Sequence, residues 1–237
     1  SLHDALPISM LVLEPYKLIG GDLTLDRVGE DVISEAEEGE LKQLLQKGII
    51  DAYTLIDYST SLAFHLPESG ELNFPSTAMG VDGAVYPLAG SLTLADPLDK
   101  SLAELIRQVG DVVITRDLAL EYDLVVGDSL VLTDLNLGTP LEGHVRGIAS
   151  DTPNHQGSKV YYSHDTAARL MGKARTGNTV LVNAEDPDLV QKLLETTGWR
   201  VFTADALADM TKAREGAMGM GLNDLGLLGL LVGGLGI

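Results

Sequence analysis

The last thirteen residues of the chain, 225–237, carry no charged or strongly polar side chain. Five of them are glycine, which is unfavourable in helices in water but common in membrane helices, where small residues let neighbouring backbones approach. As a helix this run would be about 20 Å long, short of the roughly 30 Å hydrocarbon layer of a membrane. We therefore expect the truncated start of a transmembrane helix. The alternative is a buried core helix or a glycine-rich tail.

Composition and charge limit the class of protein. The chain has 237 residues, enough for one large domain or two small ones, and its 45% apolar and 22% charged residues predict a packed core. The absence of cysteine excludes disulfides, thiolate metal sites and a cysteine nucleophile, and it leaves the compartment open. The 35 acidic against 16 basic side chains, a net charge of -19, argue against nucleic acid as a partner.

Two β-α-β patterns lie near the two ends of the chain. The first has a strand over 17–25, a helix over 34–46 that Gly48 ends, and a second strand over 49–64. The second has a strand over 179–183, a helix over 186–197 with Pro187 in its first turn, and a strand over 199–203. The two patterns share an order of elements rather than sequence identity.

The middle of the chain has a different pattern, in which glycine and proline separate short apolar segments. We expect short helices over 101–108 and 116–122, and strands over 111–115, 127–133 and 143–149. Gly127 and Asp128 have a structural role there, because glycine accepts a positive φ and the aspartate can accept hydrogen bonds from the backbone of its own turn. The centre is therefore a β-rich insertion.

The predicted fold class is α+β, with the two terminal β-α-β units forming one lobe and a β-rich lobe inserted between them. The expected divisions are a non-native leader over 1–9, the first β-α-β part over 10–66, the inserted lobe over 67–175, the second β-α-β part with a connecting helix over 176–216, and the truncated transmembrane helix over 217–237.

No catalytic, cofactor-binding or metal-ligating residue is predicted. The chain contains no G-x-x-x-x-G-K-[ST] phosphate loop, no G-x-S-x-G motif and no H-E-x-x-H motif. His144, His155 and His164 lie close in sequence, but their spacing matches no helical or hairpin pair of metal ligands, so we interpret them as solvated histidines. The chain is therefore expected not to be an enzyme.

Three other features have a simpler structural interpretation. The acidic group lacks a calcium-loop motif and is interpreted as the solvated start of a helix; it comprises Glu30, Asp31, Glu35, Glu37, Glu38 and Glu40. The polar loop 151–157 is interpreted as a connector, although such loops often contact partners. Tyr161 and Tyr162 are expected to pack within a strand rather than to form a binding surface.

Several segments together resemble a known family. The sequences VVITRDLA at 112–119, LVVGDSLVL at 124–132 and VRGI at 145–148 resemble the MacB-like periplasmic core domain, the extracytoplasmic insert of FtsX-like ABC transporter permeases. In that family the domain lies between a first and a glycine-rich second transmembrane helix, and residues 227–237 resemble the start of the second. The resemblance covers roughly 16–237, and none of its motifs is a catalytic signature.

The resemblance implies a mechanical role for the chain as part of a permease in the cell membrane, with its main domain extracytoplasmic. Its partners would be a separate cytoplasmic ABC-type ATPase, the membrane and a second permease copy in a dimer. ATP-driven motion would pass through the segment 203–224. The permease would use this motion to export or extract a lipoprotein, lipid or drug. Two alternatives stay open: a soluble acidic α+β enzyme or binding module with a buried tail, and a signalling permease that activates a cell-wall hydrolase.

Overall fold

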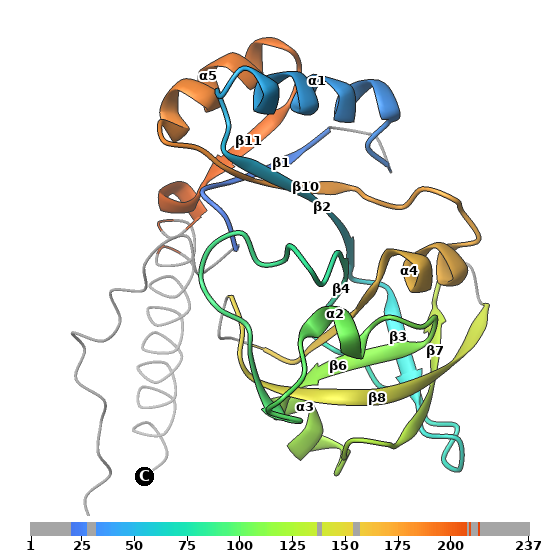
Figure 1. The fold of residues 1–237 in the computed structure, drawn as a ribbon. Coiled ribbons are helices and arrows are strands. Elements are labelled where there is room, and N and C mark those ends of the chain that lie inside the picture. Colours follow the sequence, from blue (N-terminus) through green and yellow to red (C-terminus); the bar gives the residue numbers. More distant parts are fainter. Residues whose placement is uncertain are drawn as a thin grey trace, which may run out of the picture.

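A computed structural model describes residues 20–27, 32–136, 139–153, 157–207, 209 and 213 (Figure 1). The strands in these ranges are β1 (Leu23–Asp26), β2 (Ala52–Ser59), β3 (Leu62–His65), β4 (Thr77–Val81), β5 (Thr93–Asp96), β6 (Asp111–Thr115), β7 (Ser129–Asp134), β8 (Pro140–Asp151), β9 (Lys159–Ser163), β10 (Thr179–Asn183) and β11 (Arg200–Thr203). The helices are α1 (Glu35–Gln46), α2 (Leu102–Leu105), α3 (Arg116–Glu121), α4 (His164–Met171) and α5 (Pro187–Thr196).

The first and last described strands and helices build one lobe, the terminal lobe, as the sequence predicts. Its strands follow the order β11-β1-β10-β2 with antiparallel neighbours, so each β-α-β unit places one strand between the two strands of the other. Helices α1 and α5 lie together on one face of this sheet (Figure 1). Leu23, Val180, Val182, Leu41 and Trp199 are buried in the core between sheet and helices.

The helix ends of the terminal lobe follow from local sequence. The Ser34 side chain accepts a hydrogen bond from the backbone N–H of Glu37, and the Glu37 carboxylate accepts one from the N–H of Ser34. This capping box satisfies backbone donors that have no partner within the helix. Asp186 caps α5 in front of Pro187, and Gly48 follows α1 with a φ of 66°.

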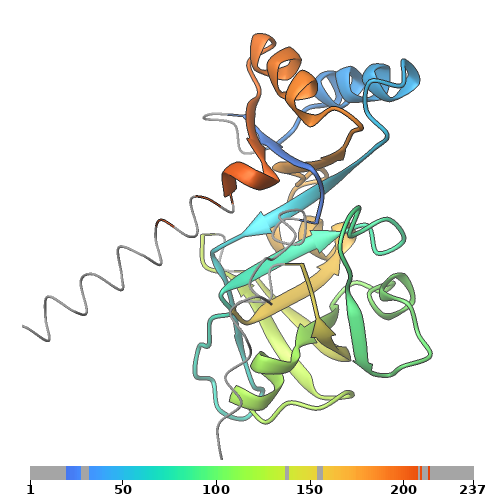
Figure 2. The same ribbon diagram turned by 90° about the vertical axis from the view of Figure 1, so that its left-hand side faces the viewer.

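Residues from β3 to α4 form the β-rich inserted lobe, which lies below the terminal lobe in Figures 1 and 2. Its strands follow the order β4-β9-β6-β8-β7-β3, with β5 added to β8. The pairs β4–β9 and β6–β8 are parallel. Buried side chains from several of these strands fill its core, among them Phe64, Val112, Leu132, Val145 and Val160.

Strand β2 belongs to both lobes. Its first five residues pair with β10, and its last three pair with β4. A third cluster of buried side chains also joins the lobes, because Ile56 and Leu181 of the terminal lobe pack with Tyr86, Val113 and Tyr161 of the inserted lobe. The two lobes therefore share a strand and a packed core.

The strand expected over 49–64 is divided into β2 and β3. The polar residues between them form a turn, in which Ser61 N–H donates to Ser59 Oγ at 3.2 Å and Ser61 Oγ donates to Asp134 Oδ2 at 2.8 Å. Strand β3 then pairs with β7. Although β3 falls within the expected range 10–66, it lies in the inserted lobe.

The turn at Gly127 and Asp128 confirms the structural role inferred from the sequence. Gly127 has a φ of 104°, and Asp128 Oδ2 accepts a hydrogen bond from Val125 N–H at 2.8 Å.

The helix expected over 101–108 is shorter than predicted, because α2 covers four residues before the chain turns into β6.

Two expectations lie outside the described residues: the leader over 1–9 and the transmembrane start over 217–237. Of the segment 203–224, the residues 203–207, 209 and 213 are described, and those after Thr203 are helical. No helix in the described ranges combines the length and apolar character that spanning a membrane requires.

Candidate functional site

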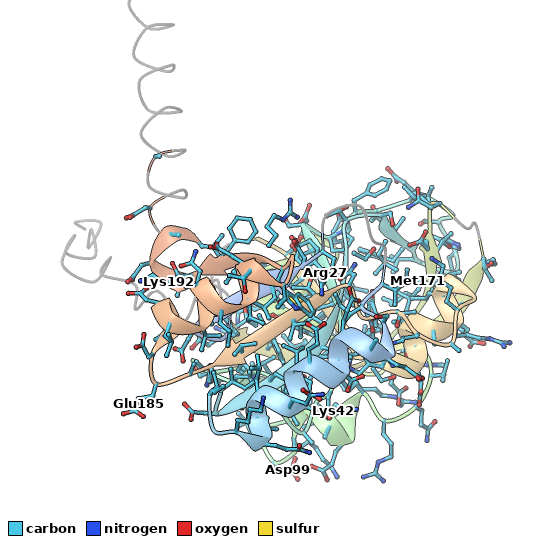
Figure 3. The ribbon with its side chains drawn as sticks, turned by 90° about the horizontal axis from the view of Figure 1, so that it is seen from above. Arg27, Lys42, Asp99, Met171, Glu185 and Lys192 are labelled. Atoms are coloured by element: carbon cyan, nitrogen blue, oxygen red, sulfur yellow. The ribbon has the colours of Figure 1, made fainter. Side chains whose placement is uncertain are left out.

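The two lobes enclose a cleft of about 510 Å³, here called the interlobe cleft. Arg27, Asn178 and Arg200 line it from the terminal lobe, and Asp134 and Met171 are among the residues lining it from the inserted lobe. Figure 3 labels one residue from each lobe: Arg27, which follows β1 of the terminal lobe, and Met171, which ends α4 of the inserted lobe. A volume of this size is typical of sites for small organic ligands.

A buried carboxylate, Asp57, lies on the wall of this cleft. Asp57 is 2% exposed and stands on β2 where the strand changes partner from β10 to β4. Its Oδ2 lies 2.7 Å from Nδ1 of His164, the first residue of α4, whereas its Oδ1 is buried without a hydrogen-bond partner. A buried polar atom without a partner is rare in folded proteins, because losing hydration costs free energy.

The neighbouring strand makes room for the Asp57 side chain. Gly80 is the cross-strand partner of Asp57, and a Cβ at position 80 would lie 2.5 Å from Asp57 Oδ2. Only glycine fits there without moving the carboxylate. The backbone of β4 is thus adapted to an acidic side chain at this point of β2.

The pKa of His164 is raised above its ordinary value. Burial alone would lower this pKa, but the hydrogen bond to Asp57 and the charge of Asp57 outweigh it, and Asp82 and Asp165 add to the effect. The protonated imidazole therefore forms an ion pair with Asp57. This pair connects α4 to β2 at the junction of the lobes.

We expect the His164 ion pair to stabilise the protein at low pH. Because the folded-state pKa is raised, the contribution is complete below the unfolded pKa of about 6.5 and is lost as the pH rises through the folded pKa. His164→Gln should lower the free energy of unfolding by up to about 1 kcal/mol near pH 6 and by less near pH 9, since the side chain is 38% exposed and water screens the pair.

Chemical denaturation of both proteins at several pH values checks this expectation. His144→Gln is the matched control, because the neighbour of His144 is the exposed Glu142. A stability difference for His164→Gln that grows with rising pH would contradict the assigned pair.

A second buried carboxylate, Asp134, also lines the cleft. Its two oxygens accept hydrogen bonds from Ser61 Oγ at 2.8 Å and from Asn136 N–H at 2.9 Å. Tyr162 lines the same wall, and burial, followed by the charges of Asp57 and Asp134, raises its pKa well above the ordinary value. The Tyr162 hydroxyl therefore stays protonated at neutral pH, beside negative charge.

Two arginines of the cleft rim have acidic partners, and Lys173 also lines the cleft. Arg200 Nε lies 2.6 Å from Asp26 Oδ1, and Arg27 Nε lies 2.8 Å from Glu37 Oε1. The Asn178 side chain forms two hydrogen bonds with the backbone of Tyr58, at 2.9 and 2.8 Å.

The histidines singled out in the sequence are placed on different elements. His144 lies on β8 near Glu142, His164 begins α4, and His155 lies outside the described residues. In the described part of the chain, no group of three or more histidine, cysteine or acidic side chains is placed to hold a metal ion.

Three acidic residues of α1 have structural partners. Glu37 completes the capping box, Glu38 pairs with Arg175, and Glu40 accepts a hydrogen bond from Trp199 Nε1. Glu35 is exposed in the first turn. Glu30 and Asp31 lie outside the described residues.

The polar loop 151–157 contacts a buried lysine where it is described. Lys159 is 2% exposed, and its Nζ donates to Thr152 Oγ1 at 3.3 Å. Burial lowers the Lys159 pKa to about 8, against the opposing charge of Asp117. The neighbouring tyrosines are 0% and 2% exposed, so Tyr161 and Tyr162 pack within β9 as the sequence predicts.

Asp57 and Asp134 are not predicted from the sequence, and His164 is interpreted from it only as a solvated histidine. One pattern points to Asp57: it is a single charged residue in the segment 52–58, where apolar and aromatic residues predominate. Acidic side chains are seldom fully buried unless they have a partner. The partner, His164, lies 107 positions away, so no local motif connects the two.

Comparison with known proteins identifies a related fold. No family model matches the chain, and the search of curated proteins found no match. Among solved structures, the chain is similar to the periplasmic region of MacB from Actinobacillus actinomycetemcomitans, with a TM-score of 0.51 and 13% sequence identity. The match covers 84% of this chain and 97% of the other. At this level of identity the likeness shows a distantly shared mixed α/β fold.

Proposed function

We propose that this chain supplies the extracytoplasmic domain of an ABC transporter permease. A separate cytoplasmic ATPase drives the membrane helices, and the domain transmits that motion to export or extract a lipoprotein, lipid or drug. The domain takes no part in covalent chemistry. The shared fold with the periplasmic region of MacB supports this proposal, as does the position of the first and last strands.

The observation that carries the proposal is the pairing of β1 with β11. Leu23, which begins β1, is the register partner of Thr203, which ends β11, and Ala204 N–H donates to Asp22 O at 3.1 Å. The chain therefore enters and leaves the described fold at the same place. A domain inserted between two neighbouring membrane helices needs this arrangement.

The contacts between the lobes support a rigid transmission of motion. Besides the shared β2 and its core, Asn183 Nδ2 donates to Leu88 O at 3.0 Å and Ala89 N–H donates to Gly20 O at 2.9 Å. Close-packed interiors are stiff and transmit strain. A displacement applied at β1 and β11 would thus reach the inserted lobe.

Membrane attachment is the first test. The full chain and a chain ending at residue 221 are expressed and separated into membrane and soluble fractions. The full chain is expected in the membrane fraction, to be released by detergent but not by high salt, because an apolar segment partitions into lipid. The shorter chain is expected in the soluble fraction.

High salt serves as the control for adsorption through charge. Equal solubility of both forms would contradict the permease proposal and favour a soluble acidic module. Retention of both forms in the membrane would show that the attachment lies elsewhere in the chain.

A further inference from the structure

We propose that the outer edge of the sheet in the inserted lobe binds a basic, extended peptide segment, which adds to the sheet as a further strand. This edge, here called the 71–75 edge, follows β3 and lies below it in Figure 1, on the side of the inserted lobe away from the terminal lobe. The inference concerns a protein partner of the inserted lobe and does not depend on the proposed transport function.

Hydrogen bonds hold this segment as the outermost strand of the sheet. Asn73 N–H donates to Phe64 O at 2.7 Å, and Phe64 N–H donates to Asn73 O at 2.9 Å, while the other side of β3 pairs with β7. Because the backbone groups of successive residues in a strand point to opposite sides, those of Leu72 and Phe74 point away from β3. Within the part of the chain that the structure describes, neither residue forms a backbone hydrogen bond. Their donors and acceptors can therefore pair with another strand.

The side chains at this edge are apolar and exposed. Leu72 is 46% exposed and Phe74 is 53% exposed, whereas native sheets commonly protect an edge with charged residues. In an antiparallel pairing, the partner residues opposite Leu72 and Phe74 would exchange backbone hydrogen bonds with them and lie on the same face of the sheet. Pro75 has no N–H and ends the edge, so the pairing is short. The edge thus fits an extended segment with apolar residues at alternate positions.

The charge of the surrounding segments favours a basic partner. The segments 62–76 and 117–135, which hold β3, the 71–75 edge, most of α3 and all of β7, contain no lysine or arginine. They do contain acidic residues: Glu68, Glu71, Asp117, Glu121, Asp123, Asp128 and Asp134. A partner with lysine or arginine beside its apolar residues is therefore attracted to this edge.

Two of these carboxylates lie close to the edge itself. The ring of Tyr122 packs on that of Phe64, with their centroids 5.2 Å apart. Burial raises the Tyr122 pKa, and Glu121 and Glu71 raise it further, which places both carboxylates near the pair that Phe64 forms with Asn73. A second copy of the chain would bring the same negative charges to the edge, and like charges on paired strands are destabilising. The charge thus favours a basic segment over self-pairing.

Titration of the full chain with a capped hexapeptide of alternating lysine and valine tests the proposal, followed by NMR chemical shifts in a non-ionic detergent and about 0.15 M salt. Saturable binding is expected, with shifts at β3 and at residues 71–75. The matched probe is the same peptide with N-methylated valines. It keeps the charge but lacks the N–H donors that would face Leu72 and Phe74, so it is expected to bind at least about tenfold more weakly.

Variants locate the site. Leu72→Lys should weaken binding of the lysine–valine peptide about tenfold, because it removes an apolar contact and places a like charge on the edge. Leu189→Lys changes the net charge equally at a residue of α5 that is 57% exposed, and it should leave the affinity within about twofold. This control matters because the chain has a net charge of -19 and attracts any basic peptide weakly.

Equal affinity for the two peptides overturns the proposal without requiring any variant to fold, since charge alone then holds the peptide. Equal weakening by the two lysine substitutions also overturns it, because the attraction is then non-specific. Self-association that Leu72→Lys abolishes, with no binding of the peptide, would assign the edge to a second copy of the chain instead. Absence of binding, or shifts confined to other strands, likewise overturns it.

Discussion

Replacing Gly110 with alanine is expected to lower the free energy of unfolding by about 2–5 kcal/mol. Gly110 has a φ of 91°, and a Cβ there would lie 2.3 Å from the backbone oxygen of Glu142. The Cβ is fixed directly to the backbone of residue 110, and the oxygen belongs to the backbone of Glu142. No side-chain rotation can therefore relieve this clash. Gly110 also donates its N–H to Thr166 Oγ1 at 3.1 Å, which connects the start of β6 to α4.

Thermal unfolding measures this effect, and the melting temperature should fall by roughly 5–15 °C. Gly39→Ala is the matched control. Gly39 lies inside α1 with no atom within 4 Å of a Cβ, so alanine should stabilise the helix by about 0.5–1 kcal/mol. A small effect of Gly110→Ala would mean that β8 can move away from β6, and that the inserted lobe is less tightly packed than described.

Local rules predicted the elements of the terminal lobe because each end of a helix there has its own cap. Ser34, Gly48 and Pro187 act within a few residues of their own position, so the sequence shows them directly. The turn between β2 and β3 was missed for a different reason. Besides its local bond to Ser59, Ser61 donates a hydrogen bond to Asp134, which lies 73 positions away.

The interlobe cleft could not be predicted because its parts come from distant segments. Asp57 meets His164 across 107 positions, and Gly80 is needed only because β4 pairs with β2. Parallel pairing of β4 with β9 then places α4, which follows β9, beside Asp57. The site is thus a product of strand order, which no single pattern in the sequence specifies.

Leu181→Ala is expected to destabilise the protein by about 2–5 kcal/mol and to loosen the connection between the lobes. Leu181 is 4% exposed on β10, and its neighbours Val180 and Val182 belong to the core under α1 and α5. Leu181 belongs instead to the cluster with Tyr86 and Tyr161 of the inserted lobe. Shortening it leaves a cavity at the junction rather than inside either lobe.

Leu189→Ala is the matched control, because Leu189 is 57% exposed on α5 and should change the stability by less than about 0.5 kcal/mol. Spin labels on Lys192→Cys and Asp99→Cys report the distance between the lobes (Figure 3), and the natural chain has no cysteine that would react. The distance distribution should broaden with Leu181→Ala and not with Leu189→Ala.

The distance measurement separates two ways in which such a domain could transmit motion. If the shared core makes the lobes one stiff body, the unaltered junction gives a narrow distribution, and Leu181→Ala should broaden it. If the distribution is already broad with Leu181 present, the junction bends. The continuous sheet through β2 would then act as a flexible hinge, and the rigid transmission inferred from the packing of Tyr86, Tyr161 and Leu181 would be wrong.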